Sequence, residues 1–373
     1  MILNLDCRHG LAMLPDNSVD AILTDPPYEL GFMGHRWDRS GIAYDVAMWR
    51  EALRVLKPGG HMLAFSGSRT YHRMACAIED AGFEVRDSIM WVYGSGFPKS
   101  LDISKAIDKI YGAERQVVGQ QYRATTGRDE GYGFGESFDI TAPATLAAQL
   151  WEGWGTGLKP AHEPICVARK PMQAPTVAAN VLAWGVGGLN IDGCRIPVDP
   201  VADASQLRTM NVSQHDGADG WGMNTSRANP AARVLGEEGR WPANFIHDGL
   251  TDEWARFFYC AKASRKDRDE GLQEFPSSTG ATMGSGIGDQ PDQSRANNKN
   301  SHPTVKPTEL MRYLCRLITP PGGLVLDIFA GSGSTGKAAA LEGFQFLGFE
   351  LNAEFTTLAN ARYEHALSQK GAI

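Results

Sequence analysis

The sequence has no two cysteines close enough to form a CxxC motif. Its six cysteines are scattered along 373 residues, and the nine histidines do not cluster with them. This argues against both a disulfide framework and a structural zinc site. We expect buried, reduced thiols, as in a cytoplasmic protein, and no bound metal. The cysteines are Cys7, Cys76, Cys166, Cys194, Cys260 and Cys315.

A secretory signal and a membrane span are also missing. No basic and apolar segment with a small-residue cleavage site opens the chain, and no apolar run is long enough to cross a bilayer. The apolar start Met1–Leu5 is short and ends at Asp6, which is typical of a strand. We therefore expect a cytoplasmic protein with no membrane-bound part.

Positive charge is in short supply, since the net charge is −7. A protein with this balance that binds nucleic acid has to gather its cations locally. The best local candidate is the run from 262 to 268, where Lys262, Arg265, Lys266 and Arg268 are candidate phosphate contacts. The alternative is a solvated helix face.

What the chain does contain is an alternation of strand-like and helix-like segments. Val19–Thr24 is an apolar run that stops at an Asp-Pro-Pro turn. Asp45–Leu56 has helical spacing and is followed by the breakers Lys57–Gly60. His61–Phe65 and Glu84–Val92 are the next predicted strands. This order predicts an α/β fold built on a parallel sheet.

The composition changes between 171 and 300, where short ordered islands alternate with Asn-, Asp-, Ser- and Gly-rich segments. We expect an insertion on the first domain there and not a second core. Regular α/β texture returns afterwards, with predicted strands at Leu324–Phe329 and Gln345–Phe349. The chain is therefore predicted to have three parts, 1–170, 171–300 and 301–373.

A glycine-rich turn follows the first of these C-terminal strands. Leu324–Gly336 has the pattern of a strand, a turn and a helix start, and its glycines match GxGxxG. The free amides at such a helix start favour an anionic group. Glu350 follows at the tip of the next strand, where an acid binds ribose in NAD enzymes and methyltransferases alike. Asp327 favours the methyltransferase, because a carboxylate there accepts from a methionine ammonium and repels a pyrophosphate.

The tetrapeptide Asp25-Pro26-Pro27-Tyr28 follows a predicted strand, at the edge where open α/β sheets bind ligands. An exocyclic amino group of a base is a poor nucleophile, because its lone pair is delocalised into the ring. The Asp25 carboxylate and the Pro26 carbonyl can accept its two N–H bonds and free that lone pair, and prolines fix the direction of the carbonyl. Tyr28 supplies a ring that stacks on an extruded base. The tetrapeptide is therefore predicted to support direct, in-line methyl transfer. The alternative is that its two prolines only terminate the strand.

With both motifs in this order, the chain resembles the β-class amino-methyltransferases of DNA. The resemblance implies an S-adenosylmethionine-dependent, Rossmann-like fold with a seven-stranded, circularly permuted sheet, which Met1–Asp6 continues. It makes 1–170 the catalytic half, 171–300 an inserted target-recognition region and 301–373 the cofactor-binding half. It also implies double-stranded DNA as substrate and a homodimer. Restriction–modification and orphan enzymes share this pattern, so a partner endonuclease is left open.

The resemblance assigns roles residue by residue. Asp25, Pro26, Pro27 and Tyr28 are the implied catalytic residues. Ser301–Pro307 resembles a His-Pro-Thr-x-Lys-Pro block that borders the cofactor pocket. The implied cofactor contacts are Asp6, His302, Thr304, Lys306, Asp327, Phe329, Gly331, Ser332, Gly333, Ser334, Thr335 and Glu350.

Two further expectations concern the DNA. Arg36 and Trp37 lie in the loop after the tetrapeptide, where they are candidates to close over a flipped base or fill its place in the duplex; the alternative is a surface loop with a packed tryptophan. Asp at the first tetrapeptide position resembles the adenine N6 enzymes, whereas Ser is commoner in cytosine N4 enzymes. No cysteine follows a proline, which argues against C5-cytosine chemistry.

The leading hypothesis is therefore adenine N6 methylation of DNA with base flipping. Cytosine N4 methylation is the nearest alternative. More distant ones are methylation of a protein glutamine, a nicotinamide oxidoreductase, and a DNA-binding regulator that has lost catalysis.

Overall fold

The computed structural model contains two compact units. One is built from Met1–Tyr93 and His162–Ile373, and the other is Gly94–Ala161. The three-part division of the chain stays a prediction, and the structure adds a boundary that it lacked, around Gly94–Ala161. The structure describes residues 1–31, 36–94, 100–122, 137–198, 239–250, 255–256, 258–260, 265–277 and 299–370.

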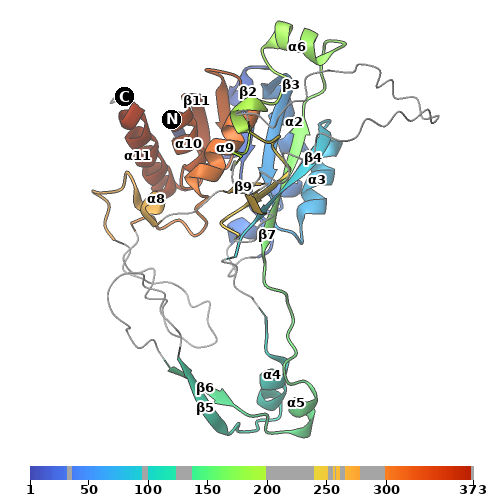
Figure 1. Cartoon of the computed structure of the whole chain (residues 1–373), viewed down its shortest axis with the longest axis vertical. Helices are drawn as coiled ribbons and strands as arrows, with labels where there is room; N and C mark the ends of the chain where they lie inside the picture. Colours follow the sequence, from blue (N-terminus) through green and yellow to red (C-terminus); the bar gives the residue numbers. More distant parts are fainter. Residues whose placement is uncertain are drawn as a thin grey trace, which may run out of the picture. The chain divides into compact units, whose positions relative to one another are not determined.

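A sheet of nine strands, counted over the described residues, forms the middle of the first unit (Figure 1). Its order is β1-β11-β10-β2-β3-β7-β4-β8-β9. Strand β7 is antiparallel to both neighbours, and the other pairings are parallel. The first seven strands in this order match the predicted seven-stranded sheet, and β8 and β9 extend it at one edge. The bounds are β1 Ile2–Asn4, β2 Val19–Thr24, β3 Leu56–Phe65, β4 Glu84–Val92, β7 His162–Arg169, β8 Phe245–His247, β9 Tyr259–Cys260, β10 Leu324–Asp327 and β11 Gln345–Glu350.

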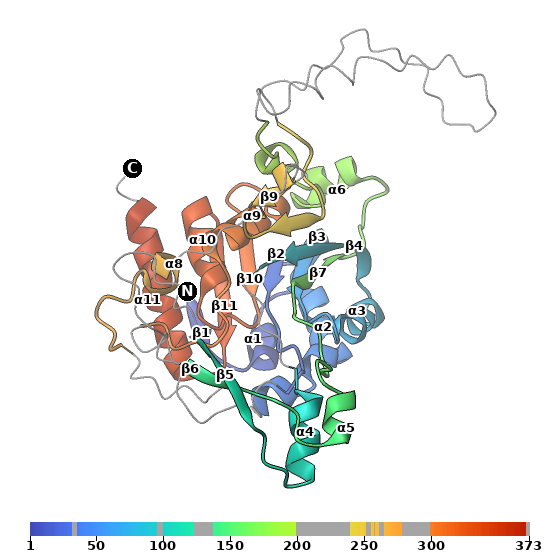
Figure 2. The same ribbon diagram turned by 60° about the horizontal axis from the view of Figure 1, so that its bottom comes forward.

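Strands from the two ends of the sequence are neighbours in this sheet, as Figure 2 shows. Ile2–Asn4 pair in parallel with Gly348–Glu350 of β11. Val325 of β10 pairs with Ala21 of β2. The expectation that the first residues continue the sheet of the C-terminal strands is therefore confirmed.

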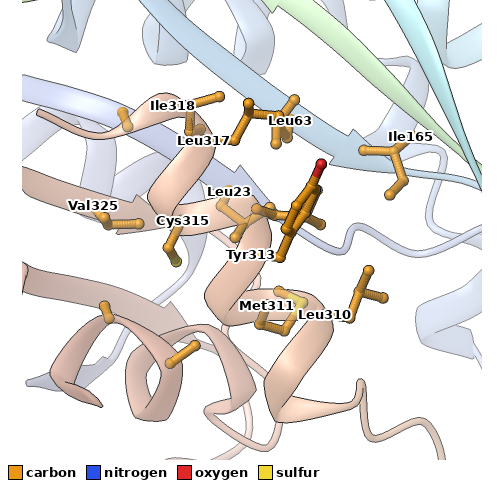
Figure 3. Close-up of a cluster of buried hydrophobic side chains, with 14 of the residues drawn as sticks. Leu23, Leu63, Ile165, Leu310, Met311, Tyr313, Cys315, Leu317, Ile318 and Val325 are labelled. Carbon is orange, nitrogen blue, oxygen red and sulfur yellow. The ribbon is translucent and has the colours of Figure 1, made fainter. Parts of the chain in front are cut away.

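Helices cover both faces of the sheet and bury a core on each. Helices α9, α10 and α11 close one core, in which Tyr313 of α9 lies near Leu23 and Leu63 of the sheet (Figure 3). Helices α1, α2 and α3 close the other, around Ile22 and Met62. Because successive side chains of a strand point to opposite faces, a fully buried run such as β2 serves both cores. The bounds are α1 Cys7–Met13, α2 Val46–Val55, α3 Tyr71–Asp80, α9 Thr308–Ile318, α10 Ser334–Glu342 and α11 Ala353–Lys370.

One predicted boundary is wrong. Helix α2 ends at Val55, one residue before the predicted end, and the breakers Lys57–Gly60 lie inside β3 and not before it. The pairing of β2 with β3 shifts its register between Val19 and Ala21, and Gly59 has a φ of +80°. The breakers therefore make an irregular stretch within the strand, because the strand can absorb extra residues at a bulge.

The described parts of 171–300 join the first unit. Strands β8 and β9 extend its sheet, and Asn180 of α6 (Val177–Trp184) donates to the carbonyls of Pro58 and Val186. Short α8 (Arg265–Asp269) contributes Asp267, which accepts from the backbone N–H of Thr308. These segments therefore contact both the sheet and helix α9 of the first unit.

The second unit is small and has a polar centre. It contains α4 (Ile103–Ile110), α5 (Leu146–Leu150) and an antiparallel pair, β5 (Val117–Tyr122) with β6 (Ser137–Thr141). Buried Asp108 accepts from Arg115 at 2.6 Å and from the Thr145 hydroxyl at 2.8 Å. In neither unit does a described helix have the length and apolarity needed to cross a membrane.

Candidate functional site

The tetrapeptide and the glycine-rich loop lie at the same edge of the sheet. Strand β2 ends at Thr24, directly before Asp25, and its neighbour β10 ends at Asp327. The Thr24 hydroxyl donates to Oδ1 of Asp327 at 2.8 Å. Because parallel strands end at one edge, two motifs 303 residues apart meet in one site.

Asp25 is held through one of its carboxylate oxygens. Oδ2 accepts from Nζ of Lys306 at 2.7 Å. Oδ1 is buried and has no hydrogen-bond partner among the described residues. A buried polar atom left without a partner costs about 1–3 kcal/mol, so it calls for a functional explanation. Asp25 therefore presents one free acceptor at the end of β2.

Lys306 is the centre of a buried polar cluster. Its Nζ also donates to the Tyr28 hydroxyl at 3.1 Å and lies 3.3 Å from Oε2 of Glu163. The Tyr28 hydroxyl in turn donates to the same Glu163 oxygen at 2.7 Å. The four groups Asp25, Tyr28, Glu163 and Lys306 are called the base-site cluster below.

The charges of the base-site cluster follow from its surroundings. Burial alone lowers the pKa of Lys306, but the carboxylates of Asp25 and Glu163 outweigh it and raise the pKa above its ordinary value. Burial, then the same two carboxylates, raise the pKa of Tyr28 well above its ordinary value. At neutral pH the lysine is an ammonium and the tyrosine a neutral phenol.

The expectation that Lys306 borders the cofactor pocket stays a prediction. Its ammonium lies on the tetrapeptide, with Asp25 and Tyr28. His302, four residues earlier, stays at the glycine-rich loop, where its ring faces Gly331. The Ser301–Pro307 block therefore spans the distance between the two motifs.

The glycine-rich loop is held closely on both sides. Gly331 has a φ of +51°, and a Cβ there would lie 3.0 Å from the His302 ring. Gly333 has a φ of +76°, and a Cβ there would lie 2.9 Å from backbone atoms of Ala359 in α11. The His302 ring also makes an edge contact with Phe355, and burial lowers its pKa to about 4. The loop therefore packs against a neutral imidazole and α11.

Two acids organise this loop. Asp327 accepts from the Thr335 hydroxyl at 2.6 Å and from the Phe329 N–H at 3.1 Å. Burial raises its pKa to about 6. Glu350 accepts from the Gly331 N–H at 2.9 Å, and burial raises its pKa also. Both acids lie where the sequence predicted them, at the ends of adjacent strands.

Ser332 and Ser334 share a cation that the sequence did not suggest. Nη1 of Arg362, in α11, donates to the Ser332 carbonyl at 2.6 Å and lies 3.2 and 3.3 Å from the two serine hydroxyls. Arg362 is fully buried, and burial lowers its pKa to about 10. The loop therefore has a buried guanidinium beneath its serines.

The remaining predicted cofactor contacts are placed as follows. Asp6 caps α1 by accepting from the Arg8 N–H at 2.9 Å. Phe329 is half-buried and packs against the core closed by α1, α2 and α3. Thr304 is exposed, and its N–H donates to Nδ1 of His302.

The predicted DNA contacts are described only in part. Arg36 and Trp37 begin a short 3-10 helix, Arg36–Arg39, and Arg265 and Lys266 begin α8, but their side chains lie outside the described atoms. Lys262 lies outside the described residues altogether. Nη2 of Arg268 donates to the carbonyls of Asn300 and His302, at 3.2 and 2.7 Å. Arg268 therefore supports the backbone that leads into the Ser301–Pro307 block, which was not expected.

Sequence reasoning missed Glu163, which lies in the middle of the site. Its signal was an acid at the start of an otherwise buried run, Glu163–Ala168. Strand β7 is antiparallel, so its first residues and not its last reach the edge where the parallel strands end. The cluster can hold an amino group at the free Asp25 oxygen, beside an anchored aromatic ring.

The chain was compared with known proteins. A family model described as DNA methylase, for N6 and N4 methyltransferases, matches residues 19–361. The DNA adenine methyltransferase YhdJ of Escherichia coli K12 is 39% identical over 66 residues, which are 18% of this chain and 22% of that protein. The match thus spans about a fifth of the relative's length.

Solved structures were also compared. The complex of M1.HpyAVI with S-adenosylmethionine aligns with a TM-score of 0.42 and 17% identity, over 97% of this chain and 98% of that one. The cytosine-N4-specific PvuII DNA methyltransferase aligns with a TM-score of 0.44 and 14% identity, over 95% and 82%.

Proposed function

Because the chain belongs to the DNA methylase family of N6 and N4 methyltransferases, we propose that it methylates the N6 amino group of adenine in double-stranded DNA. The target base leaves the duplex and enters the site at the end of β2. The chain is proposed to act as a homodimer in the cytoplasm, with or without a partner endonuclease.

The observation that carries this proposal is the free oxygen of Asp25. It is a buried acceptor with no donor among the residues that the structure describes, and it follows a strand whose last residue is bonded to Asp327, just before the glycine-rich loop. An amino group is a donor of the kind that this oxygen lacks. Tyr28, next to it, has a ring held in place by the hydrogen bond of its hydroxyl to Glu163.

The chain's own groups can lower the barrier by holding the amine. Oδ1 of Asp25 and the Pro26 carbonyl accept the two N–H bonds, so the nitrogen lone pair leaves the ring system and points at the methyl carbon. Bound S-adenosylmethionine would supply the methyl group to this lone pair, and the carbon–sulfur electron pair would leave with the sulfur. The methylated nitrogen then gives one proton to Oδ1 of Asp25, which releases it to solvent.

Enzymes of this family depend on S-adenosylmethionine, which supplies the methyl group as a sulfonium. The residues of the loop fit this group. Asp327 has hydroxyl and amide donors but no cation within the described ranges, and burial raises its pKa to about 6. A methionine ammonium would supply the missing cation. We propose that Asp327, the loop from Phe329 to Thr335, and Glu350 hold it, with Asp6, His302 and Thr304 around them.

Adenine is proposed over cytosine on two grounds. The tetrapeptide begins with Asp, and the relative YhdJ is named a DNA adenine methyltransferase. Cytosine N4 methylation is the alternative, since the family includes both activities and one aligned structure is cytosine-N4-specific. Both reactions use the same two acceptors, so the pocket around the ring has to make the choice.

Contacts with the DNA are proposed for Arg36, Trp37, Lys262, Arg265 and Lys266. The segment 171–300 is proposed to read the target sequence. Its position between the two halves of the site supports this role, because loops next to a rigid sheet commonly carry binding residues.

The test is methyl transfer from labelled S-adenosylmethionine to duplex DNA, followed by hydrolysis and identification of the base. N6-methyladenine is expected, and N4-methylcytosine alone would replace the proposal by its alternative. Asp25→Ala should abolish transfer and leave DNA binding within about twofold. A wild type that binds DNA but transfers nothing would instead favour a regulator without catalysis.

A further inference from the structure

The base-site cluster brings together three separate parts of the chain. Asp25 and Tyr28 follow β2, Glu163 is the second residue of β7, and Lys306 precedes α9. The side chains of Asp25, Glu163 and Lys306 are 19%, 18% and 8% exposed. Such a cluster is costly to assemble, because each charge loses most of its water. Two carboxylates around one ammonium leave a net charge of −1.

We infer that Lys306 and Glu163 are positioning residues of the transfer step, with Glu163 serving as a second counterion for the Lys306 ammonium. This inference rests on the proposed function. Lys306 fixes the carboxylate of Asp25, and Glu163 fixes Lys306 together with Tyr28.

The first part of the inference follows from which Asp25 oxygen is occupied. Lys306 donates to Oδ2 at 2.7 Å, and Oδ1 has no partner in the described part of the chain. A carboxylate that is free to rotate presents either oxygen in many directions. One that is tied through Oδ2 presents Oδ1 in a single direction, which is what alignment of an amino group requires.

The second part follows from the proton that leaves the amine. When Oδ1 takes this proton, Asp25 becomes a neutral acid and no longer balances the ammonium of Lys306. The carboxylate of Glu163, 3.3 Å from Nζ, is the second counterion and balances it. The lysine keeps all three of its protons throughout. A site with Asp25 alone would leave a buried, unpaired cation at this point, which is a costly state.

The net charge of −1 also acts before the proton leaves. Positive charge develops on the nitrogen as the new bond forms, and the site carries fixed negative charge beside it. Preorganised charge of this kind stabilises a transition state more than the ground state. Replacing Glu163 by a neutral amide brings the net charge of the cluster to zero.

Lys306→Met, Lys306→Arg, Glu163→Gln and Glu163→Asp test the inference in the full-length protein. Lys306→Met is expected to lower kcat about 100-fold, the effect of a misplaced reacting group. Glu163→Gln is expected to lower kcat at least about 10-fold. Lys306→Arg and Glu163→Asp keep the charge and should recover part of the loss. The dissociation constant of S-adenosylmethionine should change less than about twofold in all four, since within the described residues no hydrogen bond or ion pair joins Lys306 or Glu163 to the glycine-rich loop.

Two matched control variants each remove an ion pair at the other end of β2 or β7, away from the base-site cluster. Lys57→Met removes the pair with Asp20, 2.6 Å long, at the start of β3. Glu84→Gln removes the pair with Arg169, which links β4 to the far end of β7. Both should leave kcat within twofold, and thermal unfolding of every variant shows whether a loss of activity follows a loss of folding.

The outcomes separate this inference from the proposed function. If the wild type methylates DNA while Lys306→Met and Glu163→Gln keep its kcat, the inference is wrong and the function stands. If their loss appears in the affinity for S-adenosylmethionine with kcat unchanged, Lys306 serves the cofactor and the inference is also wrong. If the wild type is inactive, the proposed function itself fails.

Discussion

Thr24 and Asp327, the last residues of the neighbouring strands β2 and β10, are joined by a 2.8 Å hydrogen bond from hydroxyl to carboxylate. Both residues are buried. The bond couples the tetrapeptide, which starts at the next residue, to the glycine-rich loop. A change at either end should therefore reach both motifs.

Thr24→Val tests this coupling, because it keeps the shape of the side chain and removes the donor. The variant should lose about 1.5–3 kcal/mol of unfolding free energy, the net contribution of a hydrogen bond to a charged group. Oδ1 of Asp327 keeps its second hydrogen bond, from the Phe329 N–H. Denaturant unfolding measures the loss. Thr24→Ser keeps the hydroxyl and should lose less, and equal losses in the two variants would show that packing and not the hydrogen bond matters.

Asp327 predicts a pH dependence of cofactor binding. Its pKa is raised to about 6 by burial, so the folded protein favours the neutral acid at lower pH. This contribution to stability is present below the ordinary pKa of 3.8 and is lost as the pH rises through about 6. A bound methionine ammonium needs the carboxylate, so affinity for S-adenosylmethionine should fall as the pH drops below 6.

Calorimetric titration with S-adenosylmethionine, at pH values from roughly 5 to roughly 8, measures this dependence for the wild type and for Asp327→Asn. The variant should bind weakly with a flat profile. His302 does not interfere, because burial lowers its pKa to about 4 and it stays neutral in this range. A flat profile in the wild type would contradict the assignment of Asp327 to the ammonium.

Gly333→Ala should damage the loop beyond the usual penalty for a left-handed residue. A Cβ there would lie 2.9 Å from the backbone of Ala359, which cannot rotate away. Gly185 is the matched control, with a φ of +74° and nothing within 4 Å of its Cβ position. Gly185→Ala should cost about 1–2 kcal/mol from conformation alone, and Gly333→Ala about 1–3 kcal/mol more from the clash. Denaturant unfolding of both variants measures the two losses of unfolding free energy. Similar losses would mean that α11 moves away from the added Cβ.

Arg268 and Arg265 are neighbours in α8 with different expected roles. Arg268 donates to the backbone of Asn300 and His302, so Arg268→Ala should lower thermal stability and leave the salt dependence of DNA binding unchanged. Arg265→Ala should reduce the slope of log K against log salt by about one, as loss of a phosphate contact does. A reduced slope of log K against log salt in Arg268→Ala would indicate that Arg268 contacts a DNA phosphate.

The two motifs were predictable because each is a short, continuous run of residues at the end of a predicted strand. The strand before Asp25–Tyr28 and the strand that ends at Asp327 can both be recognised in the sequence. The rule that parallel strands end at one edge of the sheet then places the two motifs in one site. Glu163 was not predictable, because its place depends on β7 running antiparallel. Arg362 was missed for a related reason. A buried cation looks like a surface residue in the sequence until its partners from other elements are known.

The compact unit Gly94–Ala161 was missed on similar grounds. Its centre is the ion pair of Asp108 with Arg115 and the hydroxyl of Thr145, and not an apolar pattern. Hydrophobic periodicity, on which the sequence analysis relied, gives no signal for a polar centre.

The pairing of β2 with β10 has a consequence for synthesis on the ribosome. Val325 is made about 300 residues after its partner Ala21, an interval on the order of 15–60 s at about 5–20 residues per second. Through that time the central strand β2 has an open edge where β10 will lie, and such edges invite pairing with other chains. Lys306 and Asp327 arrive in the same late stretch. The site at the end of β2 is therefore incomplete until these residues have been translated.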